Sequence, residues 1–70
     1  MKMIIDLYEC KKAADLNRYT KDLTACGATI ISTSLHYDEA YATLTIEVKS
    51  KETFIDKFSE KKSFEFTSLA

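Results

Sequence analysis

The most regular pattern in this chain is the alternation of apolar and polar residues over positions 41–48. The apolar positions are Ala42, Leu44, Ile46 and Val48, and the positions facing the other way are Tyr41, Thr43, Thr45 and Glu47. A period of two is the spacing of a β-strand that buries one face and turns the other away from the core. The chain must therefore supply a second layer that covers the apolar face of this strand.

The remaining periodicities predict what supplies that layer. Residues 3–8 and 29–36 also alternate like strands, with Ile31, Thr33 and Leu35 expected on the core face of the second. Apolar residues at three- and four-residue steps over 16–26 predict an amphipathic helix, which Gly27 would end in a left-handed conformation.

A second helix and a last strand complete the expected order. Ser50 is a plausible N-cap for a short helix that carries Phe54, Ile55 and Phe58, and Phe64 and Phe66 alternate with polar residues in a final strand. The order predicts one α+β domain over residues 1–70, a ferredoxin-like βαββαβ fold. In that fold two helices cover one face of a four-stranded antiparallel sheet.

Such an arrangement leaves the other face of the sheet uncovered. The residues expected there mix aliphatic, aromatic, hydroxyl and acidic groups: Ile4, Asp6, Tyr8, Ile30, Ser32, Ser34, His36, Tyr41, Thr43, Thr45 and Glu47. This composition is too apolar for an ordinary solvated face and too polar for a core. It favours a subunit interface, a ligand site, or both.

Size and composition narrow the function. A 70-residue chain buries only about 60% of its unfolded surface, so self-association is the expected stabiliser. Cys10 and Cys26, without a signal-peptide pattern, indicate reduced and buried thiols in a cytoplasmic protein. A net charge of −1 with interspersed acids and bases argues against nucleic acid as the main partner. The apolar runs are too short for a membrane span. A single histidine argues against a metal site.

Two segments, Ile4-Ile5-Asp6-Leu7-Tyr8-Glu9-Cys10 and the stretch from Cys26-Gly27-Ala28-Thr29-Ile30 to His36, resemble the first two strands of bacterial-type S-adenosylmethionine decarboxylases. The resemblance covers about the first half of the chain. Those enzymes carry a Glu-Ser-His segment after the third strand, where self-cleavage forms a pyruvoyl group. Here residues 46–52 read Ile-Glu-Val-Lys-Ser-Lys-Glu, so Ser50 lacks both neighbours and no pyruvoyl group is expected.

A decarboxylase-like chain without that segment is similar to the small bacteriophage enzymes that degrade S-adenosylmethionine. The resemblance implies a lyase in which the substrate carboxylate attacks its own Cγ and releases 5′-methylthioadenosine and homoserine lactone. It further implies a homo-oligomer, as a trimer, with sites between subunits and without metal or cofactor, in the cytoplasm of a host cell.

The candidate catalytic residues are Glu52 and Tyr41. Glu52 begins the second expected helix and could hold the substrate α-ammonium, although the helix dipole alone also favours an acid there. Tyr41 could contact the sulfonium or adenine and orient the substrate carboxylate, or serve as an interface aromatic.

Four further residues are candidates for substrate binding: Ser32, Ser34, His36 and Glu47. The serine hydroxyls could bind ribose or amino-acid groups, whereas β-propensity also explains them. His36 fits a structural or interface role, because the lactonisation needs no general base. Glu47 could meet a sulfonium or pair with a lysine across the strands.

The alternative hypothesis is a non-catalytic small-molecule-binding βαββαβ regulatory module that uses the same face. The segment Glu9-Cys10-Lys11-Lys12 lacks the Asp-x-Pro-Gly type of loop common in such modules. A protein-interaction module is a third possibility, for which the sequence has no positive motif.

Overall fold

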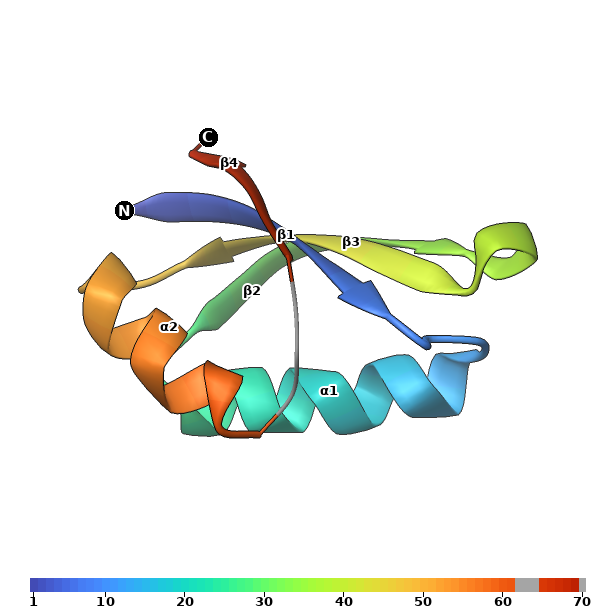
Figure 1. Ribbon diagram of the computed structural model, residues 1–70, viewed down its shortest axis with the longest axis horizontal. Helices are drawn as coiled ribbons and strands as arrows, with labels where there is room; N and C mark the ends of the chain where they lie inside the picture. Colours follow the sequence, from blue (N-terminus) through green and yellow to red (C-terminus); the bar gives the residue numbers. More distant parts are fainter. Residues whose placement is uncertain (62–64, 70) are drawn as a thin grey trace.

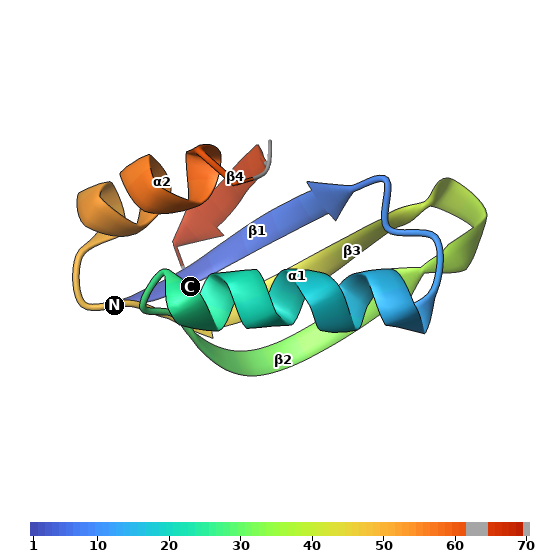
Figure 2. The ribbon, with the colours of Figure 1, turned by 90° about the horizontal axis from the view of Figure 1, so that it is seen from below.

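The computed structural model describes residues 1–61 and the backbone of residues 65–69 (Figure 1). The elements in chain order are β1 (Lys2–Tyr8), α1 (Ala13–Ala25), β2 (Thr29–His36), the 3₁₀ turn η1 (Tyr37–Glu39), β3 (Tyr41–Glu47), α2 (Lys51–Ser59) and β4 (Glu65–Leu69). Both helices lie on the same side of the sheet (Figures 1 and 2). The opposite side of β1, β2 and β3 has no covering layer within the described part of the chain.

The strands follow the order β2-β3-β1-β4, with antiparallel pairing throughout. The expected four-stranded antiparallel sheet needs correction, because β1, β2 and β3 form a three-stranded sheet in which each strand is paired over most of its length. β4 is a five-residue edge segment whose backbone pairs with β1 through a broken register between Ile4 and Ile5. Phe64, expected in the last strand, lies outside the described residues.

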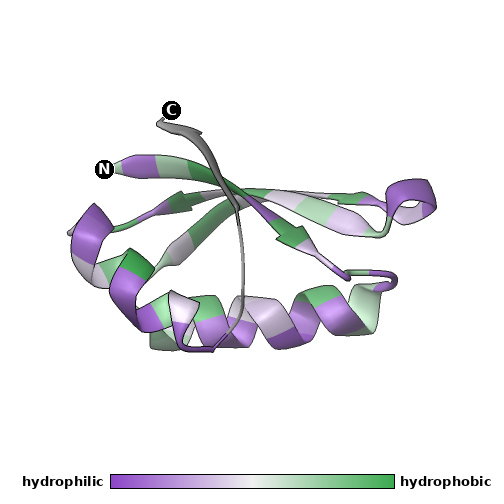
Figure 3. Ribbon diagram, viewed as in Figure 1, coloured by the Kyte–Doolittle hydropathy of each residue, from purple (hydrophilic) through white to green (hydrophobic). Residues whose placement is uncertain are grey.

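The core lies between the sheet and the two helices, as the alternation over residues 41–48 predicted. Its members in the described residues are Met3, Ile5, Leu7, Cys10, Leu23, Cys26, Ala28, Ala42, Leu44, Ile46, Val48, Phe54 and Phe58. Figure 3 shows the alternating hydropathy along the strands. Both cysteines are free and buried, as predicted. Phe54 and Phe58 stack at a centroid distance of 5.5 Å and fix α2 on the core.

Local signals at the helix ends are confirmed. Gly27 has a φ of +92°, a conformation that other L-residues adopt only with strain, and it ends the α1 segment directly after the C-cap residue Cys26. Ser50 caps α2, because its hydroxyl accepts a hydrogen bond of 3.3 Å from the backbone N–H of Thr53.

The prediction that Ile31 faces the core and Ile30 faces away from it is wrong. Ile30 pairs with Ile46 and Ser32 pairs with Thr45, so Ile31 is an extra residue without a partner on β3. This β-bulge turns Ile30 toward the core, where it packs as a partly buried side chain, and leaves Ile31 47% exposed. Thr33 and Leu35 keep the expected phase beyond the bulge, opposite Leu44 and Ala42.

Candidate functional site on the uncovered sheet face

A hydrogen-bonded row crosses three strands in the middle of the uncovered face. Asp6 of β1 lies directly opposite Thr43 of β3, and Ser34 of β2 lies opposite Thr43 on the other side. The Thr43 hydroxyl donates to Asp6 Oδ1 at 2.8 Å, and His36 Nε2 lies 3.3 Å from the same hydroxyl oxygen. The row therefore joins a carboxylate, a hydroxyl and an imidazole, all half-buried.

The single proton of the Thr43 hydroxyl determines the direction of the hydrogen bond between Thr43 and His36. A hydroxyl has one proton, and Thr43 uses it toward Asp6. Thr43 can then only accept from His36, so Nε2 must carry a hydrogen. Either the neutral Nε2–H tautomer or the imidazolium satisfies this contact, and the row persists in both forms.

An aromatic row runs beside the polar one, at the end of the sheet near η1. Tyr41 stacks on the His36 ring at a centroid distance of 4.3 Å and meets the Tyr8 ring at 5.9 Å. Tyr8 and Tyr41 are directly opposite each other in the strand pairing, which explains their contact. Tyr8 is 43% exposed, so part of this row is open to a ligand or to another protein.

Four of the six predicted site residues lie on or beside this part of the face. Tyr41 and His36 belong to the aromatic row, and Ser34 is in register with Thr43. Ser32 lies one register step further along β2, opposite Thr45 and next to the bulge. Both serines are exposed.

The two predicted acids lie elsewhere. Glu47 ends β3, the strand that Tyr41 begins, and the seven-residue strand spans roughly 20 Å at about 3.3 Å per residue. Glu47 Oε1 lies 3.2 Å from the Met1 ammonium, and both groups are half exposed. Glu52 is an exposed residue in the first turn of α2, on the helix side of the sheet. One protomer does not bring Tyr41 and Glu52 together.

The sequence interpretation placed Asp6, Thr43 and Tyr8 on this face but assigned no role to them. Strand alternation put them on the right side of the sheet. Their association with His36 depends on the strand register, which brings β1 and β2 to either side of β3. The available signal was a carboxylate in the middle of β1, between the aliphatic residues Ile5 and Leu7.

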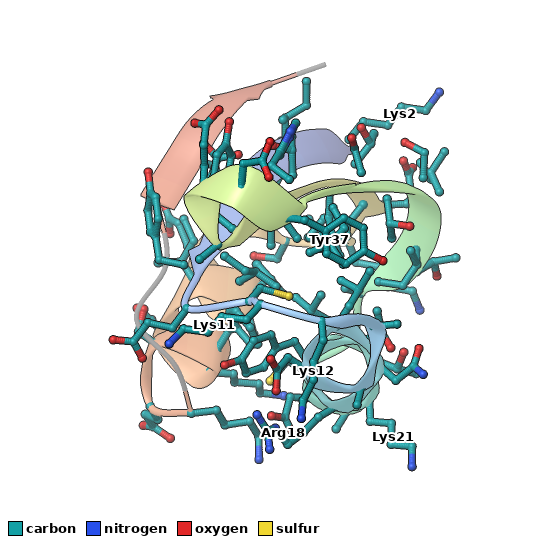
Figure 4. All side chains as sticks on the ribbon, turned by 90° about the vertical axis from the view of Figure 1, so that its right-hand side faces the viewer. Lys2, Lys11, Lys12, Arg18, Lys21 and Tyr37 are labelled. Atoms are coloured by element: carbon teal, nitrogen blue, oxygen red, sulfur yellow. The ribbon has the colours of Figure 1, made fainter. Side chains whose placement is uncertain are left out.

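Other surface features lie away from this face. A hollow of about 270 Å³ opens between the end of α1 and the start of α2, and Cys26, Lys49, Ser50 and Lys57 are among its lining residues. The basic residues Lys11, Lys12, Arg18 and Lys21 lie on the helix side (Figure 4). Within the described residues, no three His, Cys, Asp or Glu side chains are grouped as metal ligands. No helix in the same ranges is both long and apolar enough to cross a membrane.

Comparisons of the chain with protein-family models, with curated proteins and with solved structures found no match. The candidate site is therefore interpreted from its own chemistry: a half-buried carboxylate beside the exposed ring of Tyr8 and the half-buried ring of Tyr41, on a sheet face that the described residues leave uncovered.

Proposed function

We propose that this chain is a cofactor-independent S-adenosylmethionine lyase that acts as a homo-oligomer, as a trimer, with its sites between subunits. The observation that carries the proposal is the uncovered face with its Tyr8–Tyr41–His36 aromatic row beside Asp6. Aromatic faces attract cations such as a sulfonium and stack with an adenine, and a carboxylate attracts the substrate ammonium. The decarboxylase-like segments around Tyr8 and Gly27 support the same substrate.

The proposed reaction asks little of the protein beyond positioning. A substrate carboxylate oxygen forms a bond to Cγ while the Cγ–sulfur bond breaks, and its electron pair returns to the sulfur. The products are 5′-methylthioadenosine and homoserine lactone, and no proton is transferred. Holding an intramolecular nucleophile in line can supply about 7–11 kcal/mol. His36 then needs no acid–base role and serves to hold Thr43 and Tyr41.

The separation of Tyr41 from Glu47 and Glu52 within one protomer supports a site that forms between subunits. An uncovered face leaves the reacting sulfonium exposed to water, and a second copy would exclude that water. It could also bring Glu47 or Glu52, which lie away from Tyr41 in the same protomer, to the bound substrate. Ser32 and Ser34, exposed on β2, would bind ribose hydroxyls in the same interface.

Incubation of the purified protein with S-adenosylmethionine, followed by mass spectrometry of the products and of the intact chain, tests the proposal. The expected result is methylthioadenosine with homoserine lactone and an uncleaved chain of unchanged mass. In water enriched in heavy oxygen, label should enter homoserine only at the carboxyl group, through later ring opening. Decarboxylated substrate or a self-cleaved chain would contradict the proposal, and label on the Cγ oxygen would show direct hydrolysis instead. Binding without turnover would favour the regulatory module.

A further inference from the structure

The geometry points to Asp6 as the carboxylate that binds the primary ammonium group of an amino-acid ligand on the uncovered face, with Thr43 and His36 as its positioning residues. The assignment rests on the proposed function for the identity of the ligand. Asp6 lies in the middle of β1, which has β3 on one side and β4 on the other. It is half-buried on the sheet face opposite α1 and α2.

The two oxygens of Asp6 differ in their contacts within residues 1–61. The Thr43 hydroxyl donates to Oδ1 at 2.8 Å, and His36 supports that hydroxyl from β2. Within residues 1–61, the structure shows no hydrogen bond to Oδ2. Thr43 is β-branched and lies on a central strand, so its side chain has little rotamer freedom. A carboxylate fixed in this way loses little entropy when it binds an ammonium.

The neighbours of Asp6 suit the rest of such a ligand. Tyr8 projects from the same face two residues along β1, roughly 7 Å away at about 3.3 Å per residue, and Tyr41 lies diagonally opposite. In S-adenosylmethionine the ammonium and the sulfonium are separated by three carbons. Asp6 and the two rings could therefore contact the two cationic groups of one ligand at the same time.

The reaction decides which cation belongs on which group. The sulfonium loses its charge as the Cγ–sulfur bond breaks, so a carboxylate paired with it would stabilise the ground state more than the transition state. The ammonium keeps its charge throughout. A carboxylate on the ammonium therefore adds binding without opposing the reaction, which places Asp6 on the ammonium and the tyrosine rings beside the sulfonium.

Asp6 fits this role better than the acids singled out in the sequence. Glu52 and Glu47 are exposed, and Glu47 already pairs with the Met1 ammonium. Solvent and salt screen an exposed carboxylate more than a half-buried one. The ammonium role expected for Glu52 is thus assigned to Asp6.

Calorimetric binding of two unreactive thioethers tests the assignment: S-adenosylhomocysteine, and the same compound with its α-amino group replaced by hydrogen. The native chain should bind the amine about tenfold more tightly, the scale of a hydrogen bond to a charged group. Asp6→Asn keeps the shape and the Thr43 bond and should remove this preference. Asp56→Asn, at an exposed position of α2, is the matched control and should retain it.

Two Thr43 variants separate positioning from folding. Thr43→Val frees the carboxylate without removing it and should reduce the amine preference, and Thr43→Ser should restore it. These variants also test the assignment if Asp6→Asn does not fold, as judged by thermal unfolding. A preserved preference in Asp6→Asn, or none in the native chain, would overturn the assignment. An Asp6-dependent preference without cleavage of S-adenosylmethionine would overturn only the lyase proposal.

Discussion

Ile5 and Ile31 are the same residue type in opposite environments. Ile5 is completely buried in the centre of β1, whereas Ile31 occupies the bulge and is 47% exposed. Truncation of a buried isoleucine to alanine typically costs 2–5 kcal/mol, and an exposed one typically changes stability by less than about 0.5 kcal/mol.

Urea unfolding should show this difference directly. Ile5→Ala should lower the free energy of unfolding by about 2–5 kcal/mol and Ile31→Ala by less than about 0.5 kcal/mol. A 70-residue domain has roughly 4–10 kcal/mol in total, so Ile5→Val, at about 0.5–1.5 kcal/mol, serves if the alanine variant unfolds. Equal losses at the two positions would contradict the bulge.

A second prediction at the residue scale concerns Tyr41, whose aromatic ring, rather than its hydroxyl, is expected to contact the substrate. If the ring faces a sulfonium whose charge disappears during the reaction, its attraction favours bound substrate over the transition state. Tyr41→Leu should therefore raise KM several-fold and raise kcat as well, whereas Tyr41→Phe should change both little. Steady-state kinetics of methylthioadenosine release measure both. A fall in kcat for Tyr41→Leu without a rise in KM would argue that the ring positions the reacting atoms instead.

At the scale of elements, α2 depends on its first residues. It has nine residues, too few for a stable helix in isolation, so packing of Phe54 and Phe58 and the Ser50 cap hold it in place. Ser50→Ala should lower the free energy of unfolding by about 1 kcal/mol, the usual value of a lost cap. Ser59→Ala, at the exposed last position of the same helix, is the control and should cause no loss. Chemical denaturation of both variants provides the measurement, and similar values for the two would mean that the cap contributes nothing.

Elements are also where prediction from sequence succeeded and failed. Alternation and helical periodicity located the two helices, the first three strands, the Gly27 turn and the Ser50 cap, because each is a local signal. The bulge could not be predicted, since Ile30 and Ile31 are both aliphatic and only pairing with β3 decides which one faces the core. The four-stranded sheet needed correction for a similar reason: the register break between β4 and β1 has no local signal.

In the candidate site too, local patterns could be predicted and long-range contacts could not. Alternation placed Tyr41, His36 and Ser34 on the uncovered face, and the structure shows Tyr41 and His36 in one contact. Glu52 was favoured as an acid after the third strand at the start of the second helix, and the structure confirms that place, which lies in the helix layer. Whether a residue reaches a site depends on the three-dimensional course of the chain, which a linear motif does not describe.

At the scale of the whole molecule, the proposed assembly makes a prediction about the uncovered face. Light scattering should report a mass of about 24 kDa, three times the 8.0 kDa chain, and thermal stability should rise with protein concentration. Tyr8→Lys places a charge in the proposed interface and should yield monomers. Tyr37→Lys is the control, because Tyr37 is 64% exposed on the η1 turn, and it should leave the mass unchanged. A stable, fully active native monomer would contradict the assembly.

The bulge in β2 has a consequence for colloidal behaviour. β2 is an edge strand of the sheet, and half of its eight residues Thr-Ile-Ile-Ser-Thr-Ser-Leu-His are β-branched, with no acid, lysine or arginine among them. A long flat edge of this composition is a template for amyloid growth, and the extra Ile31 interrupts its regular hydrogen-bond spacing. Deletion of Ile31 restores an even edge and should shorten the lag time of thioflavin-detected fibril formation. Ile31→Ser, which keeps the interruption but lowers the hydrophobicity, should lengthen it. The β-bulge at Ile31, which the sequence pattern does not reveal, would thus keep the β2 edges of neighbouring molecules from pairing.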